Sequence, residues 1–357
     1  TFHIKNDEIV EAKKLYYAIL QNFPKNLRAQ EGLVKLKETK QNNNLQNSPE
    51  QIFHQLINHY KKNEFNVVFN EAKTLTTKFP KMFIFWNILG ASAQKLGKFD
   101  EAIDAYQKVI LLKPDLAEVY SNMGVALKEQ GKFDEAIEAH QEALSLNPNY
   151  AEAYSNIGNT FKNQGKLDDA IEAYQKALSL KPDYAESYNN VGVVLKEQGK
   201  LDEAIEAYKK AISLNFNFTE AYNNMGVVLQ EQGKFDEAIE AYKKALSLKP
   251  DYAEAYSNMG NTLLDQGNLD EAIENYKKSI ALDPDFAGAH KDLGLTLLNT
   301  GQSIDSHRIK EGLDEYEWRW KTDNFMSSWR HFPQPLWDGQ ASLTGKRILI
   351  WSEQGIG

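Results

Sequence analysis

Hydrophobic and small residues recur along much of the chain with the period of an amphipathic α-helix. In residues 151–184, Tyr154, Ile157, Gly158 and Phe161 occupy positions i, i+3, i+4 and i+7, which share one helical face. Gly165 follows them, and glycine commonly ends a helix because it adopts a positive φ without strain. The pattern predicts a first helix whose core face is formed by these four residues.

A second helix is predicted directly after that glycine. Asp168 and Asp169 lie near its start, where they interact favourably with the helix dipole. Pro182 ends it, and Asp183 and Glu186 have the spacing of a capping box for the next helix. Its buried face is predicted to comprise Leu167, Ala170, Ile171, Tyr174, Ala177 and Leu178.

The two-helix unit recurs every 34 residues. AEAYSNMG at 253–260 has close counterparts that begin at residues 117, 151, 185 and 219. A 34-residue period of two helices is the signature of the tetratricopeptide repeat. Good copies are predicted at 83–116, 117–150, 151–184, 185–218, 219–252 and 253–286, with an atypical copy at 49–82 and an incomplete one from Ala287 to Gly301.

Such a hairpin cannot bury its own hydrophobic face, so neighbouring copies must stack on one another. We therefore expect an all-α, right-handed superhelical solenoid with a concave surface built mainly from first helices. The expected domains are a divergent helical cap and linker at 1–48, the repeat array at 49–301, and a capping helix with an aromatic junction at 302–340. Two departures stand out: Phe216 replaces the proline of other copies, which predicts a looser or repacked turn, and Gly288 replaces their glutamate.

One asparagine recurs at position 6 of five copies, counting the first residue of each copy as position 1. Position 6 lies about 200° around the helix from the tyrosine at position 4, so we expect it to face the concave surface. A primary amide pairs with a peptide C=O and N–H whatever side chains the peptide carries. At about 0.5–1.5 kcal/mol for each hydrogen bond, five amides would contribute about 3–7 kcal/mol. They are Asn122, Asn156, Asn190, Asn224 and Asn258.

Other polar residues are candidates for the same surface. Acidic residues at position 13 would favour a basic or neutral segment. The alternative is that duplication copied neutral residues, as it copied Glu138, Glu172, Glu206 and Glu240 on the outer face. The further candidates are Asn189 and Asn223 at position 5, Asn159 and Asn261 at position 9, and Asp292 at position 6 of the incomplete copy.

Composition narrows the classes of partner and location. The net charge of −9, with both signs interspersed, argues against nucleic acid or an anionic membrane as the main partner. The chain has no cysteine, which excludes disulfides and thiolate metal sites, and we expect a cytoplasmic location. No metal site, catalytic residue or signal peptide is expected, and the missing initiator methionine suggests a fragment.

The copies from 117 to 286 closely resemble the repeats of O-linked N-acetylglucosamine transferases, through AEAYSNxG, QGxLDEAIExYxKAL and LxPDY/F. This resemblance implies an asparagine ladder that binds acceptor polypeptide, and the five position-6 asparagines match it. Ile88 and Asp292 occupy position 6 in the flanking copies, which suggests that the ladder stops there.

The C-terminal residues differ in kind. Five tryptophans (Trp318, Trp320, Trp329, Trp337 and Trp351) suggest docking of a further domain on the last repeat. Arg347 to Trp351 reads as a strand leading into Gly355-x-Gly357, so 341–357 is expected to be the first strand of a truncated Rossmann-type domain. The segment YEWRW…FPQPLWDGQ…KRILIWSEQGIG resembles the junction to a bacterial two-domain glycosyltransferase, which implies a sugar nucleotide for the parent enzyme and no cofactor in this chain. A strand without its sheet predicts either no order beyond about residue 340 or a homodimer through this segment.

Three functions are therefore considered. The first is the acceptor-recognition arm of a protein O-glycosyltransferase, which binds extended polypeptide. The second is a general tetratricopeptide scaffold unrelated to sugar transfer, and the third is a self-assembling adaptor.

Overall fold

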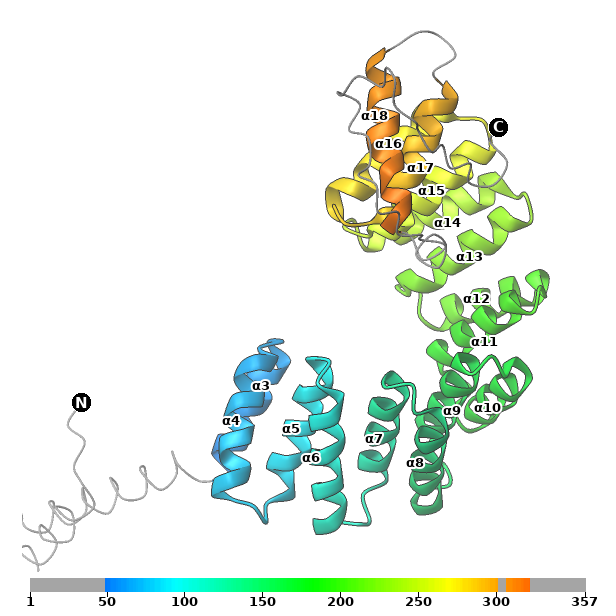
Figure 1. Ribbon diagram of the computed structural model, residues 1–357. Helices are drawn as coiled ribbons and strands as arrows, with labels where there is room; N and C mark the ends of the chain where they lie inside the picture. Colours follow the sequence, from blue (N-terminus) through cyan, green and yellow to red (C-terminus); the bar gives the residue numbers. More distant parts are fainter. Residues whose placement is uncertain (1–48, 301–305, 322–357) are drawn as a thin grey trace, which may run out of the picture. The chain divides into compact units, whose positions relative to one another are not determined.

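The computed structural model describes residues 49–300 and 306–321 (Figure 1). Within these ranges the chain forms sixteen α-helices and one 3-10 helix, with no strand. The predictions for 1–48 and 341–357, and those for Trp329, Trp337 and Trp351, lie outside the described residues. The helices are α3 (Pro49–Lys61), α4 (Phe65–Lys78), α5 (Phe83–Lys95), α6 (Phe99–Leu112), α7 (Ala117–Glu129), α8 (Phe133–Leu146), α9 (Ala151–Asn163), α10 (Leu167–Leu180), α11 (Ala185–Glu197), α12 (Leu201–Leu214), α13 (Thr219–Glu231), α14 (Phe235–Leu248), α15 (Ala253–Asp265), α16 (Leu269–Leu282), α17 (Ala287–Thr300), α18 (Ser306–Tyr316) and η1 (Glu317–Lys321).

The predicted all-α repeat fold is confirmed, because each predicted copy forms one helical hairpin. The copy at 151–184 is α9 and α10, and Gly165 between them has a φ of +73°. The incomplete copy from Ala287 also becomes a hairpin, since α18 packs against α17. The predicted capping box is wrong: the N-cap of α11 is Tyr184 and makes no side-chain cap bond. Asp183 lies one residue too early to cap this helix.

In each of the six good copies, a glycine of the first helix lies in close contact with an aromatic ring of the second helix. A Cβ atom on Gly158 would lie only 2.6 Å from Cε1 of Tyr174, whose side chain is completely buried. Tyr154 and Phe161 are only half-buried, so the expected core face is partly wrong at these two positions. Buried alanines supply more of the core than the sequence pattern indicated, because small side chains let the helices approach closely. Those of this copy are Ala151, Ala153, Ala170, Ala173 and Ala177.

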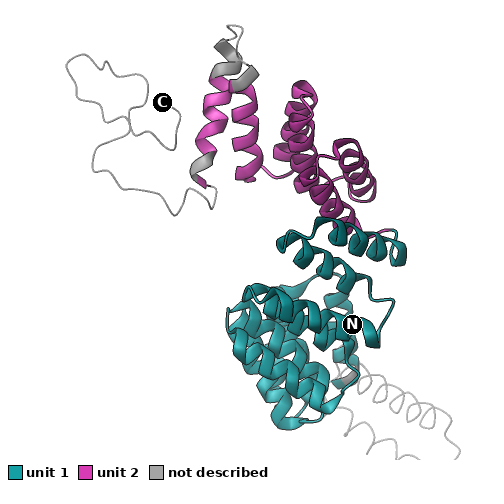
Figure 2. Ribbon diagram, turned by 90° about the vertical axis from the view of Figure 1, so that its right-hand side faces the viewer, with its two compact units in different colours: residues 1–216 teal, residues 217–357 magenta. Residues whose placement is uncertain are grey.

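The chain divides into two compact units, residues 1–216 and 217–357 (Figure 2). Their boundary follows Phe216, the residue that replaces the proline of the other copies. The side chain of Phe216 is 72% exposed, as the prolines of the other copies are exposed at this position. The departure noted in the sequence thus coincides with the division into units.

First helices form the inner side of each unit. In the first unit, Cα atoms of successive first helices (α3, α5, α7, α9 and α11) approach within 8 Å, whereas those of the described second helices do not. The second unit shows the same relation for α13, α15 and α17. A stack curves toward the side on which its elements are closer together, so each unit has first helices on its concave side.

The last described helices close the second unit. A Cβ atom on Gly294 of α17 would lie 2.5 Å from the backbone nitrogen of Tyr316, which shows how closely α18 packs. The ring of Trp318 stacks on His290 with centroids 4.0 Å apart, and the ammonium of Lys321 lies 3.4 Å from the Trp318 centroid. One predicted aromatic residue of the junction therefore packs against the last repeat.

Candidate functional site: the asparagine row

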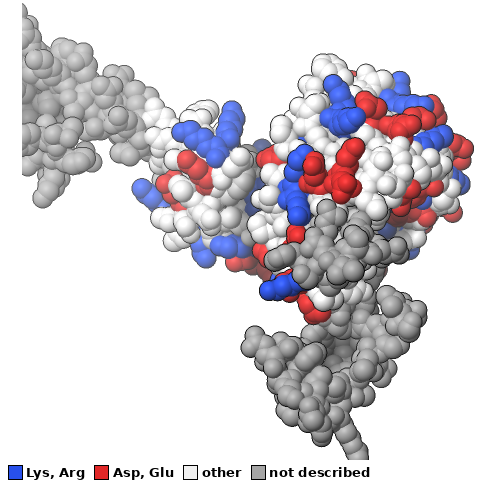
Figure 3. Space-filling model, turned by 90° about the horizontal axis from the view of Figure 1, so that it is seen from above, with Lys and Arg blue, Asp and Glu red and all other residues white. Residues whose placement is uncertain are grey.

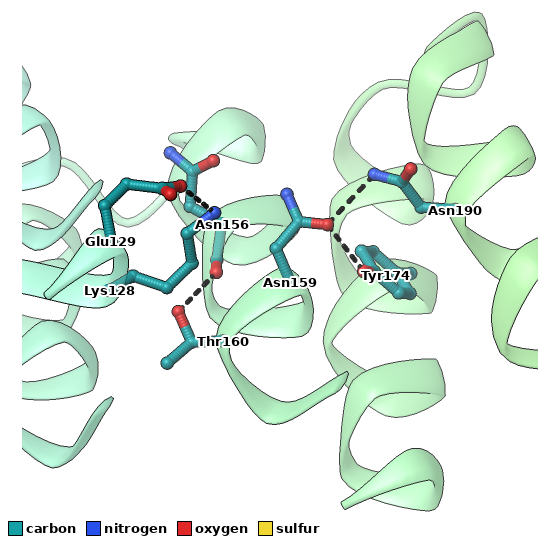
Figure 4. Close-up of polar contacts among 7 residues, drawn as sticks. All are labelled: Lys128, Glu129, Asn156, Asn159, Thr160, Tyr174 and Asn190. Atoms are coloured by element: carbon teal, nitrogen blue, oxygen red, sulfur yellow. Dashed lines mark hydrogen bonds and ion pairs between the residues drawn. The ribbon is translucent and has the colours of Figure 1, made fainter. Parts of the chain in front are cut away.

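The position-6 asparagines lie at junctions between consecutive first helices. Asn156 Nδ2 donates to Ser121 Oγ at 3.2 Å. Asn190 Nδ2 donates to Asn159 Oδ1 at 3.2 Å (Figure 4). In the second unit, Asn258 Nδ2 donates to Asn223 Oδ1 at 3.1 Å. Each amide is therefore oriented by a side chain of the preceding copy.

These bonds leave hydrogen-bonding capacity on the row. A primary amide has two N–H donors and one carbonyl acceptor, and the contacts above use one donor. Among the described residues, the side-chain Oδ1 atoms of Asn156, Asn190 and Asn258 accept no hydrogen bond. All five position-6 asparagines, including Asn122 and Asn224, are half-buried. In Asn156, Asn190 and Asn258 the amide is thus pre-oriented and retains an acceptor and a donor.

The two position-5 asparagines do not belong to the open surface. Asn189 is 8% exposed and Asn223 is 1% exposed. Asn223 also donates from Nδ2 to Glu254 Oε1 at 3.4 Å, in addition to accepting from Asn258. Their expected role as direct peptide contacts disagrees with this burial. Asn223 supports position 6 of the next copy, because Asn258 donates to its Oδ1.

The position-9 asparagines connect the row to the second helices. Asn159 Oδ1 accepts from the hydroxyl of Tyr174 at 2.7 Å as well as from Asn190. Asn261 Oδ1 accepts in the same way from Tyr276, also at 2.7 Å. Burial raises the pKa of both tyrosines, so their hydroxyls remain protonated donors. Asn159 therefore positions the neighbouring amide of Asn190.

Charged residues lie beside the row in both units. Asp292 is half-buried and its Oδ1 lies 3.1 Å from the ammonium of Lys291. Glu152 pairs with Lys181 at 2.9 Å, and the hydrogen bond from this lysine lowers the pKa of the carboxyl. Lys128 pairs with Glu129 at 2.7 Å (Figure 4). On the face seen in Figure 3, acidic and basic side chains are intermixed over the described residues.

The sequence reasoning missed a buried histidine next to the row. His140 occupies the position that is tyrosine in the other good copies, and it is completely buried. Its Nδ1 lies 3.3 Å from Ser121 Oγ, the acceptor for Asn156, while its Nε2 has no partner. Burial, with a smaller contribution from Lys128, lowers the pKa of His140 to about 4. The substitution of His for Tyr was visible in the repeat alignment and was the available signal.

A second ladder between copies was also missed. Gln164 Nε2 donates to Asp134 Oδ1 at 3.0 Å, and Gln198 Nε2 donates to Asp168 Oδ1 at 2.9 Å. Both contacts join position 14 of one copy to position 18 of the copy before it. This ladder stabilises the register of the stack. It lies at the turns, away from the row.

Other kinds of site find no support in the described ranges. No group of three or more His, Cys, Asp or Glu side chains there is arranged to hold a metal ion. No helix within the same ranges is both long enough and apolar enough to span a membrane.

The comparisons with known proteins concern the repeats. The chain is similar to the Cut9–Hcn1 hetero-tetramer of the APC/C, at 20% identity over 81% of this chain and 52% of the other, with a TM-score of 0.57. It is also similar to MamA (34% identity, 46% of this chain, 96% of the other, TM-score 0.42). A third similar structure is YrrB, described as a TPR protein with an unusual peptide-binding site (28% identity, 53% of this chain, 97% of the other, TM-score 0.41).

The Cut9–Hcn1 likeness shows the fold alone, and no curated protein matches the chain. A family model described as the cilia and flagella-associated protein 70 C-terminal domain matches residues 72–292, which is more than half of the chain. The matched range runs from α4 into α17 and contains the whole asparagine row. The chain therefore belongs to the tetratricopeptide-repeat family of the cilia and flagella-associated protein 70 C-terminal domain.

Proposed function

We propose that this protein is a protein–protein interaction module that binds extended polypeptide along the first-helix side of its repeats. The tetratricopeptide fold is consistent with a scaffold for protein interaction. One observation supports the binding of extended polypeptide. The side-chain oxygen of each of Asn156, Asn190 and Asn258 is free, while one N–H of the same amide is already bonded to the preceding copy.

This geometry favours recognition of main chain over side chain. The bond to the preceding copy restricts the amide before any ligand arrives, so less side-chain entropy is lost on binding. The carbonyl then accepts a peptide N–H while the second amide hydrogen meets a peptide C=O. Each such bond contributes about 0.5–1.5 kcal/mol, so the proposal predicts weak binding with broad sequence tolerance.

The connection to sugar transfer is a separate and finer proposal. It rests on the resemblance of residues 117–286 to O-linked N-acetylglucosamine transferase repeats, and on the resemblance at the C-terminal junction. It predicts that the parent gene continues past Gly357 into a sugar-nucleotide-binding domain. A parent gene without such a domain would exclude the role of acceptor-recognition arm and leave the interaction module in place.

The test replaces all five position-6 asparagines with alanine in the full chain. The probe is a fluorescein-labelled, uncharged peptide of glycine, serine and threonine, and the measurement is fluorescence anisotropy. We expect the variant to lose binding by about tenfold or more, the equivalent of two lost hydrogen bonds. Circular dichroism on the same samples reports whether the repeats remain folded.

The matched control replaces four glutamates on the exposed side of the second helices with alanine. These residues recur with the same period but face away from the row, so the control retains full binding. Equal loss in both variants, or unchanged binding in the asparagine variant, would refute the proposal and favour a general scaffold. The control residues are Glu138, Glu172, Glu206 and Glu240.

A further inference from the structure

The first-helix surfaces of the two units differ in charge. Position 12 holds Lys128, Lys162 and Lys196 in the first unit, each half-buried. The second unit has Gln230 and Leu264 at that position, also half-buried. The copies at 219–252 and 253–286 therefore have no basic residue at position 12.

Two contacts place the acidic residues of the second unit beside the amide row. Gln230 Nε2 donates to Asp265 Oδ2 at 2.8 Å, across the junction between α13 and α15. At the same junction Glu254 Oε1 accepts from Asn223, which in turn holds Asn258. Carboxylates at positions 2 and 13 thus lie on the same side of the stack as the position-6 amides.

The balance of charge follows from these positions. The second unit carries five carboxylates at positions 2, 6 and 13 of its copies and one lysine, Lys291, at position 5. Three copies of the first unit carry five carboxylates and three position-12 lysines, and Lys181 neutralises Glu152 in addition. The carboxylates of the second unit are Glu220, Glu231, Glu254, Asp265 and Asp292.

An unpartnered buried hydroxyl lies beneath the same surface. Tyr242 is completely buried, and its hydroxyl has no hydrogen-bond partner among the residues that the structure describes. The equivalent hydroxyls of Tyr174 and Tyr276 bond to a position-9 asparagine, but position 9 is Val227 in this copy. Burial raises the pKa of this hydroxyl, and the carboxylates of Glu231 and Glu254 add to the rise. The junction between α13 and α15 therefore carries acidic side chains above a buried hydroxyl whose hydrogen-bonding capacity is unused.

We propose that the first-helix surface of the second unit binds an extended polypeptide segment that carries lysine or arginine side chains. The inference rests on the proposed function, because the main chain of the segment lies along Asn224 and Asn258. Its cationic side chains reach the flanking carboxylates, and the half-exposed Leu264 contacts their aliphatic stems. The first unit, with its lysines, accepts a segment of either charge.

The test uses three labelled peptides that share one glycine–serine–threonine frame and carry lysines, glutamates or no charge. We expect the full chain to bind the lysine peptide about tenfold more tightly than the uncharged one at low salt, with the difference falling at high salt. Neutralising Glu220, Glu231, Glu254 and Asp265 to Gln or Asn removes the preference. The double substitution Gln230→Lys and Leu264→Lys, which copies the first unit, reduces it.

A matched variant separates a local surface from overall charge. Neutralising Glu237, Glu240, Glu271 and Glu274, which are exposed on α14 and α16, changes the net charge of the same unit by the same amount. This variant keeps the lysine preference. Equal loss in both variants, or equal affinity for lysine and uncharged peptides, overturns the inference. If no peptide binds and the five-asparagine variant behaves like wild type, the proposed function fails as well.

Discussion

The hydroxyl of Tyr242 provides a quantitative test of how position 9 supports the row. Tyr174 and Tyr276 donate to asparagines at 2.7 Å, whereas Tyr242 is buried without a partner opposite Val227. Thr262, which lowers the pKa of Tyr242 against the larger rise caused by burial, donates its own hydrogen to the backbone oxygen of Asn258 at 3.0 Å. We therefore predict that phenylalanine has opposite effects at positions 174 and 242.

The magnitudes follow from the contacts. Tyr174→Phe removes one net hydrogen bond and costs about 0.5–1.5 kcal/mol, because Asn159 Oδ1 still accepts from Asn190. Tyr242→Phe removes a buried hydroxyl that lacks the position-9 acceptor, so it stabilises the copy by about 1–2 kcal/mol. Val227→Asn supplies the missing acceptor and brings a similar gain in the wild-type background, but not with Phe at 242.

Hydrogen exchange read by mass spectrometry is the appropriate assay, because a repeat array opens locally and one unfolding midpoint averages over all copies. Tyr174→Phe should speed exchange in α9 and α10, and Tyr242→Phe should slow it in α13 and α14. Equal acceleration in both hairpins would show that Tyr242 makes a bond comparable to that of Tyr174. The explanation of position 9 would then be wrong.

Two further predictions concern stability. Because the pKa of His140 is about 4 in the fold and about 6.5 in the unfolded chain, the unfolded chain protonates first, and stability falls as the pH drops from about 6.5 toward 4. The free energy of unfolding measured in urea should fall by about 1 kcal/mol between about pH 7 and pH 5.5. His140→Tyr should abolish this part of the fall, and a variant with an unchanged pH profile would contradict the burial argument. Gly158→Ala should lower the stability measured by thermal unfolding by about 1–3 kcal/mol, because the new methyl group meets the ring of Tyr174. The loss should be much smaller in a Tyr174→Leu background, and additive losses would refute the steric explanation.

The fold and the order of its elements were largely readable from the pattern. The 34-residue period located every described hairpin from α3 to α16. The positive φ expected at the turn falls on a glycine in the six good copies and on Asn63 between α3 and α4. Cap geometry was not readable, since Asp183 has the right spacing but the helix begins after Tyr184. A capping box depends on backbone angles at one residue, and those are set by how the chain enters the stack.

The asparagine row also shows what the sequence could and could not predict. Periodicity alone put Asn156, Asn190 and Asn258 on the first-helix side of the array, because an α-helix has a known angle per residue. It could not distinguish Asn223, which is 1% exposed, from Asn224, which is half-buried, since adjacent residues differ by only 100° and a neighbouring helix covers one of them.

Local pattern therefore decided which segments become helices and which faces pair, because helix geometry depends on near neighbours in the chain. Which amides remain open to a ligand depended on contacts between residues more than 30 positions apart, such as Asn258 with Asn223 and Asn190 with Asn159. Those contacts form only when hairpins stack, so burial, the lowered pKa of His140 and the unsatisfied hydroxyl of Tyr242 became visible only in three dimensions.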